Sequence, residues 1–142
     1  MSTAATASSA PSKGLHIALW IVQVLLGLAF LMAGSGKATQ PIADLAVRMP
    51  WAAHVPEALV RFIGTSEILG GLGLILPAAT RIMPKLTGFA GIGLVTVMVL
   101  ASAFHLSRGE AMALPVNFVL GGLAAFVAWG RLKKAPIAPR GA

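Results

Sequence analysis

The chain has 142 residues, of which 57% are hydrophobic and only 11% are charged, and its formal net charge is +7. With a mean hydropathy of +0.86, this composition excludes an ordinary water-soluble domain, whose surface needs more polar residues. The chain has no cysteine, which excludes disulfides, zinc thiolate sites and iron–sulfur clusters held by the chain itself. The basic residues are dispersed and form no recognition motif, so nucleic acid is not an expected partner.

Three segments follow one another along the chain. Residues 1–13 are rich in Ser, Ala and Thr and are expected to form a disordered cytoplasmic N-terminus. Residues 14–132 are expected to form a transmembrane domain, and residues 133–142 a basic cytoplasmic tail. The apolar runs of the central segment are residues 15–34, 62–79, 86–104 and 111–130. Each run has about 18 to 20 residues, enough for a helix to cross a hydrocarbon core of about 30 Å.

The runs lack the alternating pattern of barrel strands, so helices remain as the structure that satisfies the backbone in lipid. The sequence therefore predicts an all-α fold, an integral membrane four-helix bundle. The first run could alternatively be a signal peptide, because Lys13 precedes it and Ala33-Gly34-Ser35 resembles a cleavage site. It exceeds the roughly 7 to 15 apolar residues of a usual signal core, which favours a retained membrane helix.

Prolines mark the expected helix boundaries. We expect the second membrane helix to begin near Pro56 and to end at Pro77, the third to open at Pro84, and the fourth to hold Pro115 in its first turn. Between the first two membrane helices, PIADLAVRM (41–49) predicts a short interfacial helix. The apolar face of this short helix comprises Ile42, Leu45, Ala46 and Met49.

The distribution of basic residues predicts on which side of the membrane the termini lie. With four spans, the side that holds both termini collects seven basic residues, Lys13, Arg81, Lys85, Arg131, Lys133, Lys134 and Arg140. The other side has Lys37, Arg48, Arg61 and Arg108. The positive-inside rule then predicts a multi-pass protein of the cell membrane with both termini in the cytoplasm.

Glu67 is the residue that most needs an explanation, because a charge at the bilayer centre is costly. Its helical neighbours Gly64, Gly70 and Gly71 form a stripe that faces another helix. Arg61 is a poor partner within the same helix, so partners must come from other helices. The candidate intramembrane polar cluster comprises Glu67, Lys37, His105, Asn117, Gln23 and Arg61.

Each candidate also has a structural interpretation. Lys37 and Arg61 could extend to the headgroups, and His105 could mark only the interface. Asn117 and Gln23 could make interhelical hydrogen bonds, and Glu67 could fix helix packing. Haem is not expected from His16, His54 and His105, which are scattered, and no triad, phosphate loop or metal-ligand spacing is present. We name no catalytic residue.

Five stretches in order resemble the DoxX-like membrane protein family. They are MAGSGK (32–37), RFIGTSEILGGLGLILP (61–77), TRIMPKLTGFAGIGL (80–94), FHLSRGE (104–110) and VNFVLGGLAAFVAWGR (116–131). The similarity covers roughly Leu15 to Arg131. It implies a compact four-helix bundle and maps the family's lysine, glutamate and histidine onto Lys37, Glu67 and His105. Members of the family are associated with quinone-linked sulfur oxidation, membrane oxidoreductase assemblies, or receptor assembly.

Three functions follow as hypotheses. The first is an accessory or quinone-facing subunit of a membrane redox system, with quinone as the cofactor and oxidoreductase subunits as partners in the bilayer. The second is a non-enzymatic assembly or stabilising protein, for which a homo-oligomer is one arrangement. The third is a small proton-coupled transporter that uses Glu67. Enzyme activity by this chain alone is not expected under any of the three.

Overall fold

A computed structural model describes residues 9–142 and shows an all-α bundle. Within these residues, four long helices are apolar enough to cross a membrane, and a short helix lies between the first two. The long helices are α1 (Lys13–Thr39), α3 (Glu57–Thr80), α4 (Lys85–Ser107) and α5 (Leu114–Trp129). Most of the N-terminal segment expected to be disordered, residues 1–8, lies outside the described residues.

Short helical elements lie between the long helices and after the last one. The short helix α2 (Ile42–Arg48) is followed by a 3₁₀ turn, η1 (Pro50–His54). A second 3₁₀ turn, η2 (Ala111–Ala113), precedes α5, and a π-helical turn, η3 (Gly130–Lys134), follows it. Leu45 of α2 is fully buried and packs with Ala52 and Val60. The predicted apolar face of the short helix is therefore confirmed.

Three of the proline predictions agree with the structure and one is wrong. Pro56 and Pro84 immediately precede α3 and α4, and Pro115 lies in the first turn of α5. Pro77, however, lies inside α3, which continues to Thr80. A proline removes one backbone donor and crowds the carbonyl four residues earlier, here that of Gly73, yet membrane helices accommodate such a defect. The helix ends instead at Arg81, whose φ of 59° leaves the helical region.

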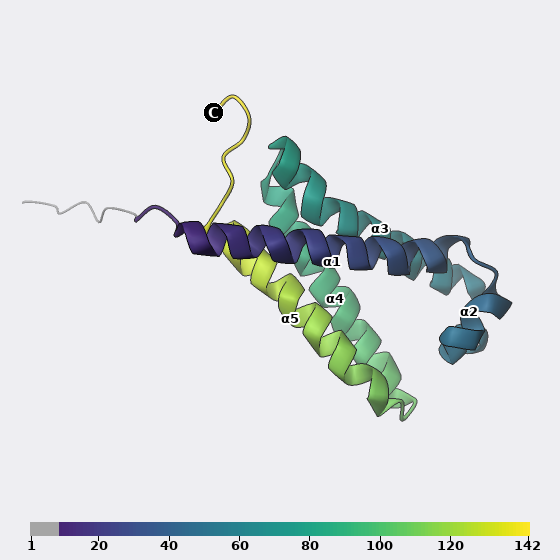
Figure 1. The fold of residues 1–142 in the computed structure, drawn as a ribbon. Coiled ribbons are helices and arrows are strands. Elements are labelled where there is room, and N and C mark those ends of the chain that lie inside the picture. The colour runs from purple at the N-terminus through teal and green to yellow at the C-terminus, as the bar shows by residue number, and fades with distance from the viewer. Residues whose placement is uncertain (1–8) are drawn as a thin grey trace, which may run out of the picture.

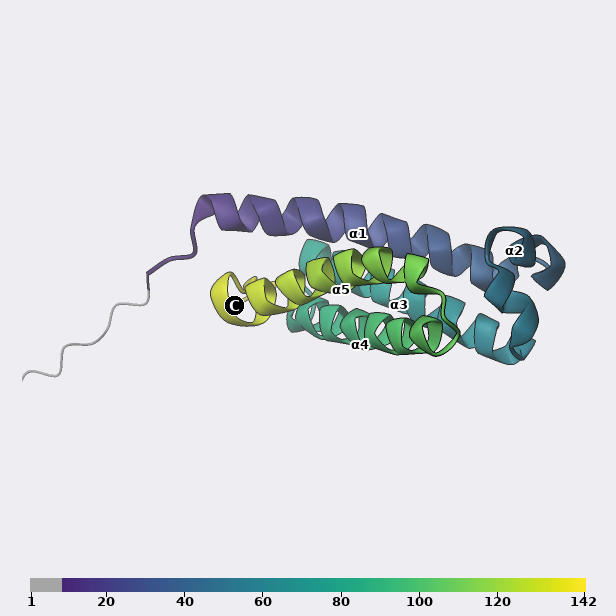
Figure 2. The same ribbon diagram turned by 90° about the horizontal axis from the view of Figure 1, so that it is seen from below.

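The four long helices form two pairs that splay apart. Helix α1 packs along α3, and α4 packs along α5. The pairs meet through contacts between α3 and α4 and diverge toward the end that carries α2 (Figure 1). We call this the α2 end. The start of α1 and the C-terminus lie at the opposite end, the termini end (Figure 2).

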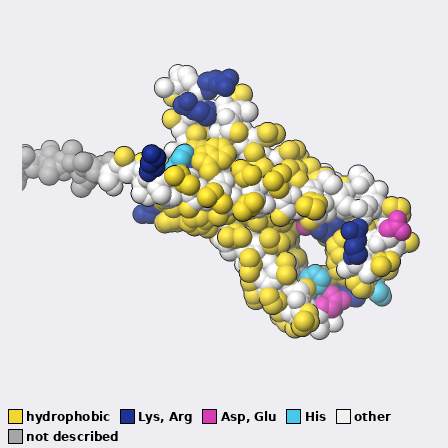
Figure 3. All heavy atoms as spheres, in the orientation of Figure 1, with side chains coloured by type: hydrophobic (Ala, Val, Ile, Leu, Met, Phe, Trp, Pro, Cys, Tyr) yellow, Lys and Arg dark blue, Asp and Glu magenta, His cyan; other side chains and the backbone are white. Residues whose placement is uncertain are grey.

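The core lies where the pairs meet. Phe30 of α1, Leu74 of α3, Leu94 of α4 and Val127 of α5 are almost completely buried in one apolar cluster. Large apolar side chains elsewhere on the helices are exposed, which suits helices that face lipid (Figure 3). The divergence beyond this core leaves room between the pairs at the α2 end.

Candidate functional site

A buried ion pair joins α1 to α3. Lys37 in the last turn of α1 places its Nζ 2.7 Å from Oε2 of Glu67, and these side chains are only 10% and 5% exposed. Glycines bring the two helices together, because a Cβ on Gly64 would lie 2.7 Å from the carbonyl oxygen of Gly34. The two charges therefore compensate each other away from water.

This ion pair lines a cavity of about 490 Å³ between the two helix pairs, which we call the ion-pair cavity. Figure 3 shows the hollow, with charged and histidine side chains gathered around it. Its walls are mainly apolar and include Phe30, Met49, Leu59, Phe62, Val97, Met98, Phe104 and Leu120. A volume of this size matches pockets that hold small organic molecules, which are typically about 300 to 1,000 Å³.

His105, near the end of α4, lines the same cavity and is held in place by Glu110. Its Nδ1 lies 2.7 Å from Oε2 of Glu110, while Nε of Arg108 donates to the other carboxyl oxygen at 2.8 Å. The turn between them depends on Gly109, whose φ is +70°. Hydrogen bonds from His105 and then from Arg108 lower the pKa of the Glu110 carboxyl below its ordinary value. Glu110 is thus a fixed anion that orients the histidine ring.

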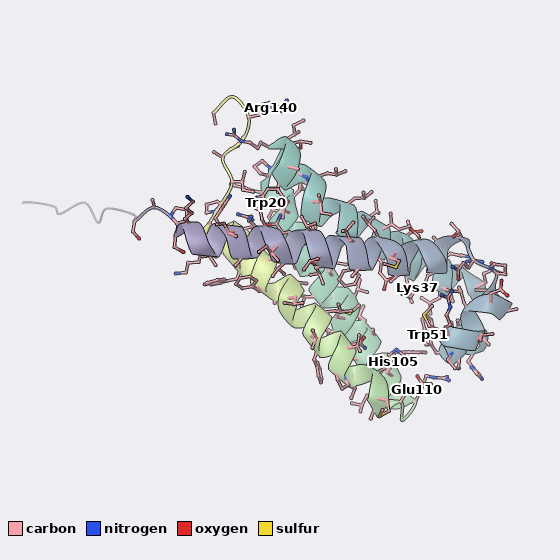
Figure 4. The ribbon with its side chains drawn as sticks, in the orientation of Figure 1. Trp20, Lys37, Trp51, His105, Glu110 and Arg140 are labelled. Carbon is pink, nitrogen blue, oxygen red and sulfur yellow. The ribbon has the colours of Figure 1, made fainter. Side chains whose placement is uncertain are left out.

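Trp51 of η1 also lines the cavity. Its indole packs edge-on against Phe104 and His105, with ring centroids 5.9 and 6.3 Å apart. Figure 4 shows Lys37, Trp51 and His105 following one another along the opening between the helix pairs. The indole therefore links the turn after α2 to the end of α4 across the mouth of the cavity.

Asn117 supplies a free hydrogen-bond donor. It is the fourth residue of α5 and lines the ion-pair cavity. Its Nδ2 is buried and finds no hydrogen-bond partner within residues 9–142. An unpaired buried donor is costly, and this one belongs to a residue of the cavity wall.

The structure thus brings together Glu67, Lys37, His105 and Asn117, and it places Gln23 and Arg61 elsewhere. Gln23 of α1 donates to the backbone carbonyl of Leu74 and accepts from Arg131, nearer the termini end. Its interpretation as an interhelical hydrogen-bonding residue matches these contacts.

Arg61 caps the C-terminal end of α1 and does not line the cavity. Its Nη1 donates to the carbonyl oxygens of Lys37 and Gln40 at 2.8 and 2.7 Å. Its Nη2 forms an ion pair with Glu57 at 2.8 Å. A cation at a helix C-terminus satisfies carbonyls that lack an intrahelical partner. Arg61 therefore holds the turn that presents Lys37.

Sequence reasoning missed two residues of this site. In the sequence, Trp51 indicates only a residue at headgroup level, and Glu110 only an acid in the loop after His105. The spacing His105-x₄-Glu110 across a glycine turn was the available signal for the second contact. No signal in the sequence placed Trp51 against His105, because that contact joins segments that are distant along the chain. Within residues 9–142, no group of three or more His, Asp or Glu side chains is arranged to hold a metal.

A model of the DoxX-like family matches residues 21–127, which include the ion pair, His105 and Asn117. The chain belongs to the DoxX-like family. This DoxX-like protein is a small multi-pass membrane protein with four candidate spans. No curated protein and no solved structure in the comparison matches it.

Proposed function

We propose that this DoxX-like protein binds a quinone in the ion-pair cavity and serves as a quinone-facing accessory subunit of a membrane redox system. The observation that carries the proposal is an apolar cavity whose wall contains the Lys37–Glu67 ion pair and Asn117, a residue whose Nδ2 has no hydrogen-bond partner among the described residues. A quinone has two carbonyl acceptors on an apolar ring, and it reaches proteins through the bilayer.

The donors around the cavity suit those carbonyls. The Lys37 ammonium has three N–H groups, one of which is directed at Glu67, and rotation of the Asn117 side chain would turn its unpaired Nδ2 toward a ligand carbonyl. Trp51 and Phe104 provide aromatic walls for the ring. The opening between the helix pairs gives an apolar tail a path to the lipid. The residues present therefore fit a quinone headgroup.

Electron transfer is assigned to a partner subunit. The chain has no cysteine, so it carries no thiol that could exchange electrons with a bound quinone. Its own groups would bind and orient the headgroup, and Glu67 would fix the position of the lysine. The excess of basic residues at the termini end supports an orientation with both termini in the cytoplasm of the cell membrane.

Tryptophan fluorescence tests the proposal. The chain has three tryptophans, so Trp20→Phe with Trp129→Phe leaves Trp51 as the only indole. In nanodiscs, short-chain benzoquinone and naphthoquinone should quench Trp51 saturably. The matched variant, Trp20→Phe with Trp51→Phe, keeps Trp129, which is 46% exposed at the termini end and should show only linear, collisional quenching. Linear quenching in both variants would reject the quinone site.

A substitution of Asn117 extends the same experiment. In the variant that retains only Trp51, Asn117→Leu removes the free donor while keeping a side chain of similar size. Quinone affinity should fall by roughly fivefold to tenfold, the effect of one hydrogen bond. The control is Phe118→Leu, since Phe118 is 66% exposed on the lipid-facing side and should leave affinity unchanged. Equal affinities in all three proteins would exclude a role for the amide.

A non-enzymatic assembly function is the second candidate, favoured by the position of the ion pair at the tightest contact of α1 with α3. In that case Glu67→Gln should lower the yield and the melting temperature of the protein. The two functions can be distinguished in the variant that retains only Trp51. Saturable quenching of Trp51 is expected only if a ligand enters the cavity.

A further inference from the structure

A second buried cation, Arg131, lies at the termini end and has no acidic partner. The residue is 2% exposed. Its Nε donates to Gln23, its Nη1 donates to the carbonyl oxygen of Ala135 at 3.1 Å, and its guanidinium lies 5.4 Å from the centre of the Trp20 ring. Its Nη2 is buried without a hydrogen-bond partner in the described part of the chain. All of these partners are uncharged.

The charges of the whole chain make this arrangement unusual. The four acidic residues are Asp44, Glu57, Glu67 and Glu110, and all of them lie in the half of the bundle nearer the α2 end. The termini end therefore has seven basic residues and no acidic residue. A buried cation without a counter-charge is strongly unfavourable. No described acidic side chain forms an ion pair with Arg131.

His16 connects Arg131 to a second cavity. A guanidinium can only donate, so the contact of 3.1 Å between Nη1 of Arg131 and Nδ1 of His16 requires Nδ1 to accept. The ring proton is then on Nε2, which no other described residue uses. His16 and Trp20 both line a cavity of about 460 Å³ at the termini end. The histidine can thus present a donor to this cavity while its other nitrogen holds the buried arginine.

The opposite wall is built by the end of α3 and the C-terminal segment. Arg81 lines the cavity, and its Nε donates to the carbonyl oxygen of Ala138 at 2.8 Å. The backbone N–H of Arg140 donates in return to the carbonyl oxygen of Arg81 at 2.9 Å. Figure 4 shows the C-terminal segment running alongside the end of α3, with Trp20 between that segment and α1. These contacts fix the tail so that it completes the cavity.

We propose that this cavity binds the phosphate of an anionic phospholipid. Arg81 and Nε2 of His16 would contact the phosphate, and Arg131 would stabilise its charge through the histidine. A lipid fits better than free phosphate, because the cavity is also lined by Trp20 and Ile137. The adjoining Ile17 and Ile82 are 50% and 61% exposed. Basic pockets at the ends of membrane helices are known to take such headgroups, and an indole is favoured at this depth.

Native mass spectrometry tests this site. The full-length protein is released from nanodiscs of equal parts phosphatidylcholine and phosphatidylglycerol, and the two retained lipids are counted. The wild type should retain phosphatidylglycerol preferentially. Arg81→Gln should reduce that retention by about fivefold, the effect of one basic residue near a lipid phosphate. The matched control, Lys85→Gln, removes the same charge from an exposed residue at the same end that does not line the cavity, and it should retain the lipid as the wild type does.

A second variant addresses the histidine. Asn at position 16 keeps an acceptor near the position of Nδ1 and removes the Nε2 donor, so His16→Asn should also reduce retention while the protein stays folded. Equal losses in Arg81→Gln and Lys85→Gln would overturn the site, because they would indicate only general attraction to a negative surface. Retention of both lipids in equal numbers would overturn it too, as would stabilisation by inorganic phosphate in phosphatidylcholine nanodiscs without selective lipid retention.

Discussion

The two buried cations of this protein lie at opposite ends and are neutralised in different ways. Lys37 has Glu67 at 2.7 Å, whereas Arg131 has only uncharged partners. A carboxylate within the bundle makes the first site self-sufficient and leaves its other hydrogen-bonding groups available to a neutral ligand. The second site has no acidic side chain of its own among the described residues. This difference is consistent with the two ligands we propose, a neutral quinone at the α2 end and an anionic lipid at the termini end.

The largest effect is expected when the Lys37–Glu67 ion pair is disrupted. Lys37→Met removes the cation and leaves Glu67 buried without compensation, which should cost about 3 to 5 kcal/mol of folding free energy. The double substitution Lys37→Met with Glu67→Leu should recover most of this loss, because no charge remains buried. Unfolding in mixed detergent micelles measures both. A double variant that is as unstable as the sum of its single variants would contradict the coupling.

The sequence draws attention to the residues of the first cluster, and not to Arg131, for a physical reason. An acidic residue inside an apolar run is conspicuous, so Glu67 led directly to Lys37, His105 and Asn117. Arg131 stands in a basic segment after the last run and was assigned to the charge asymmetry of the cytoplasmic side. Its burial arises because η3 folds its side chain against α1, next to Gln23. That contact joins residues 108 positions apart and has no local signal.

The fold itself was largely predictable. Lipid requires backbone hydrogen bonds within each segment, so four apolar runs suffice to predict four helices. The path of α3 through Pro77 was not predictable in the same way, since proline ends many helices in water. The splay of the two helix pairs was not predicted either. It is a property of how the helices pack against one another, which no single run reveals.

The second prediction concerns the glycines that bring α1 and α3 together beside the ion pair. Gly64→Ala would place a methyl group 2.7 Å from the backbone N of Ala38, and overpacking of this kind costs about 1 to 3 kcal/mol. Gly122→Ala is the control, because its Cβ would meet nothing within 4 Å; it should be neutral or stabilising by up to about 1 kcal/mol. Thermal unfolding compares the two, and equal melting temperatures would argue against close packing.

The third prediction asks whether the two ends act independently. Phosphatidylglycerol in place of phosphatidylcholine should raise the stability of the wild type, because a ligand of the folded state stabilises it. The increment should be the same, within about 0.5 kcal/mol, in the Lys37→Met, Glu67→Leu double variant, as expected for separate sites. Unfolding in the two lipids gives both increments. A lipid effect that disappears with the ion pair would mean that the anionic lipid acts at the α2 end.

The smallest expected effect is on the pH dependence of stability, and it comes from Glu110, which holds His105 in place. Its pKa is lowered in the folded protein by hydrogen bonds from His105 and Arg108, so the unfolded chain takes up the proton first as the pH falls. The stabilisation is therefore fully present above the ordinary glutamate pKa and is lost as the pH falls through the lowered one. The stability difference between wild type and Glu110→Gln should shrink on acidification. A difference that does not depend on pH would show that the carboxylate charge is unimportant.

The central claim is that the cavity beside Lys37, Glu67 and Asn117 receives a quinone. Photolabelling with an azido-benzoquinone in nanodiscs, followed by peptide mapping, tests this claim most directly. The account predicts label on the segments that carry Trp51, Phe104 and Asn117, and it predicts that unlabelled short-chain benzoquinone displaces it. Label confined to lipid-facing side chains such as Phe89 and Val99, which are 56% and 61% exposed, and not displaced by the unlabelled compound, would contradict it.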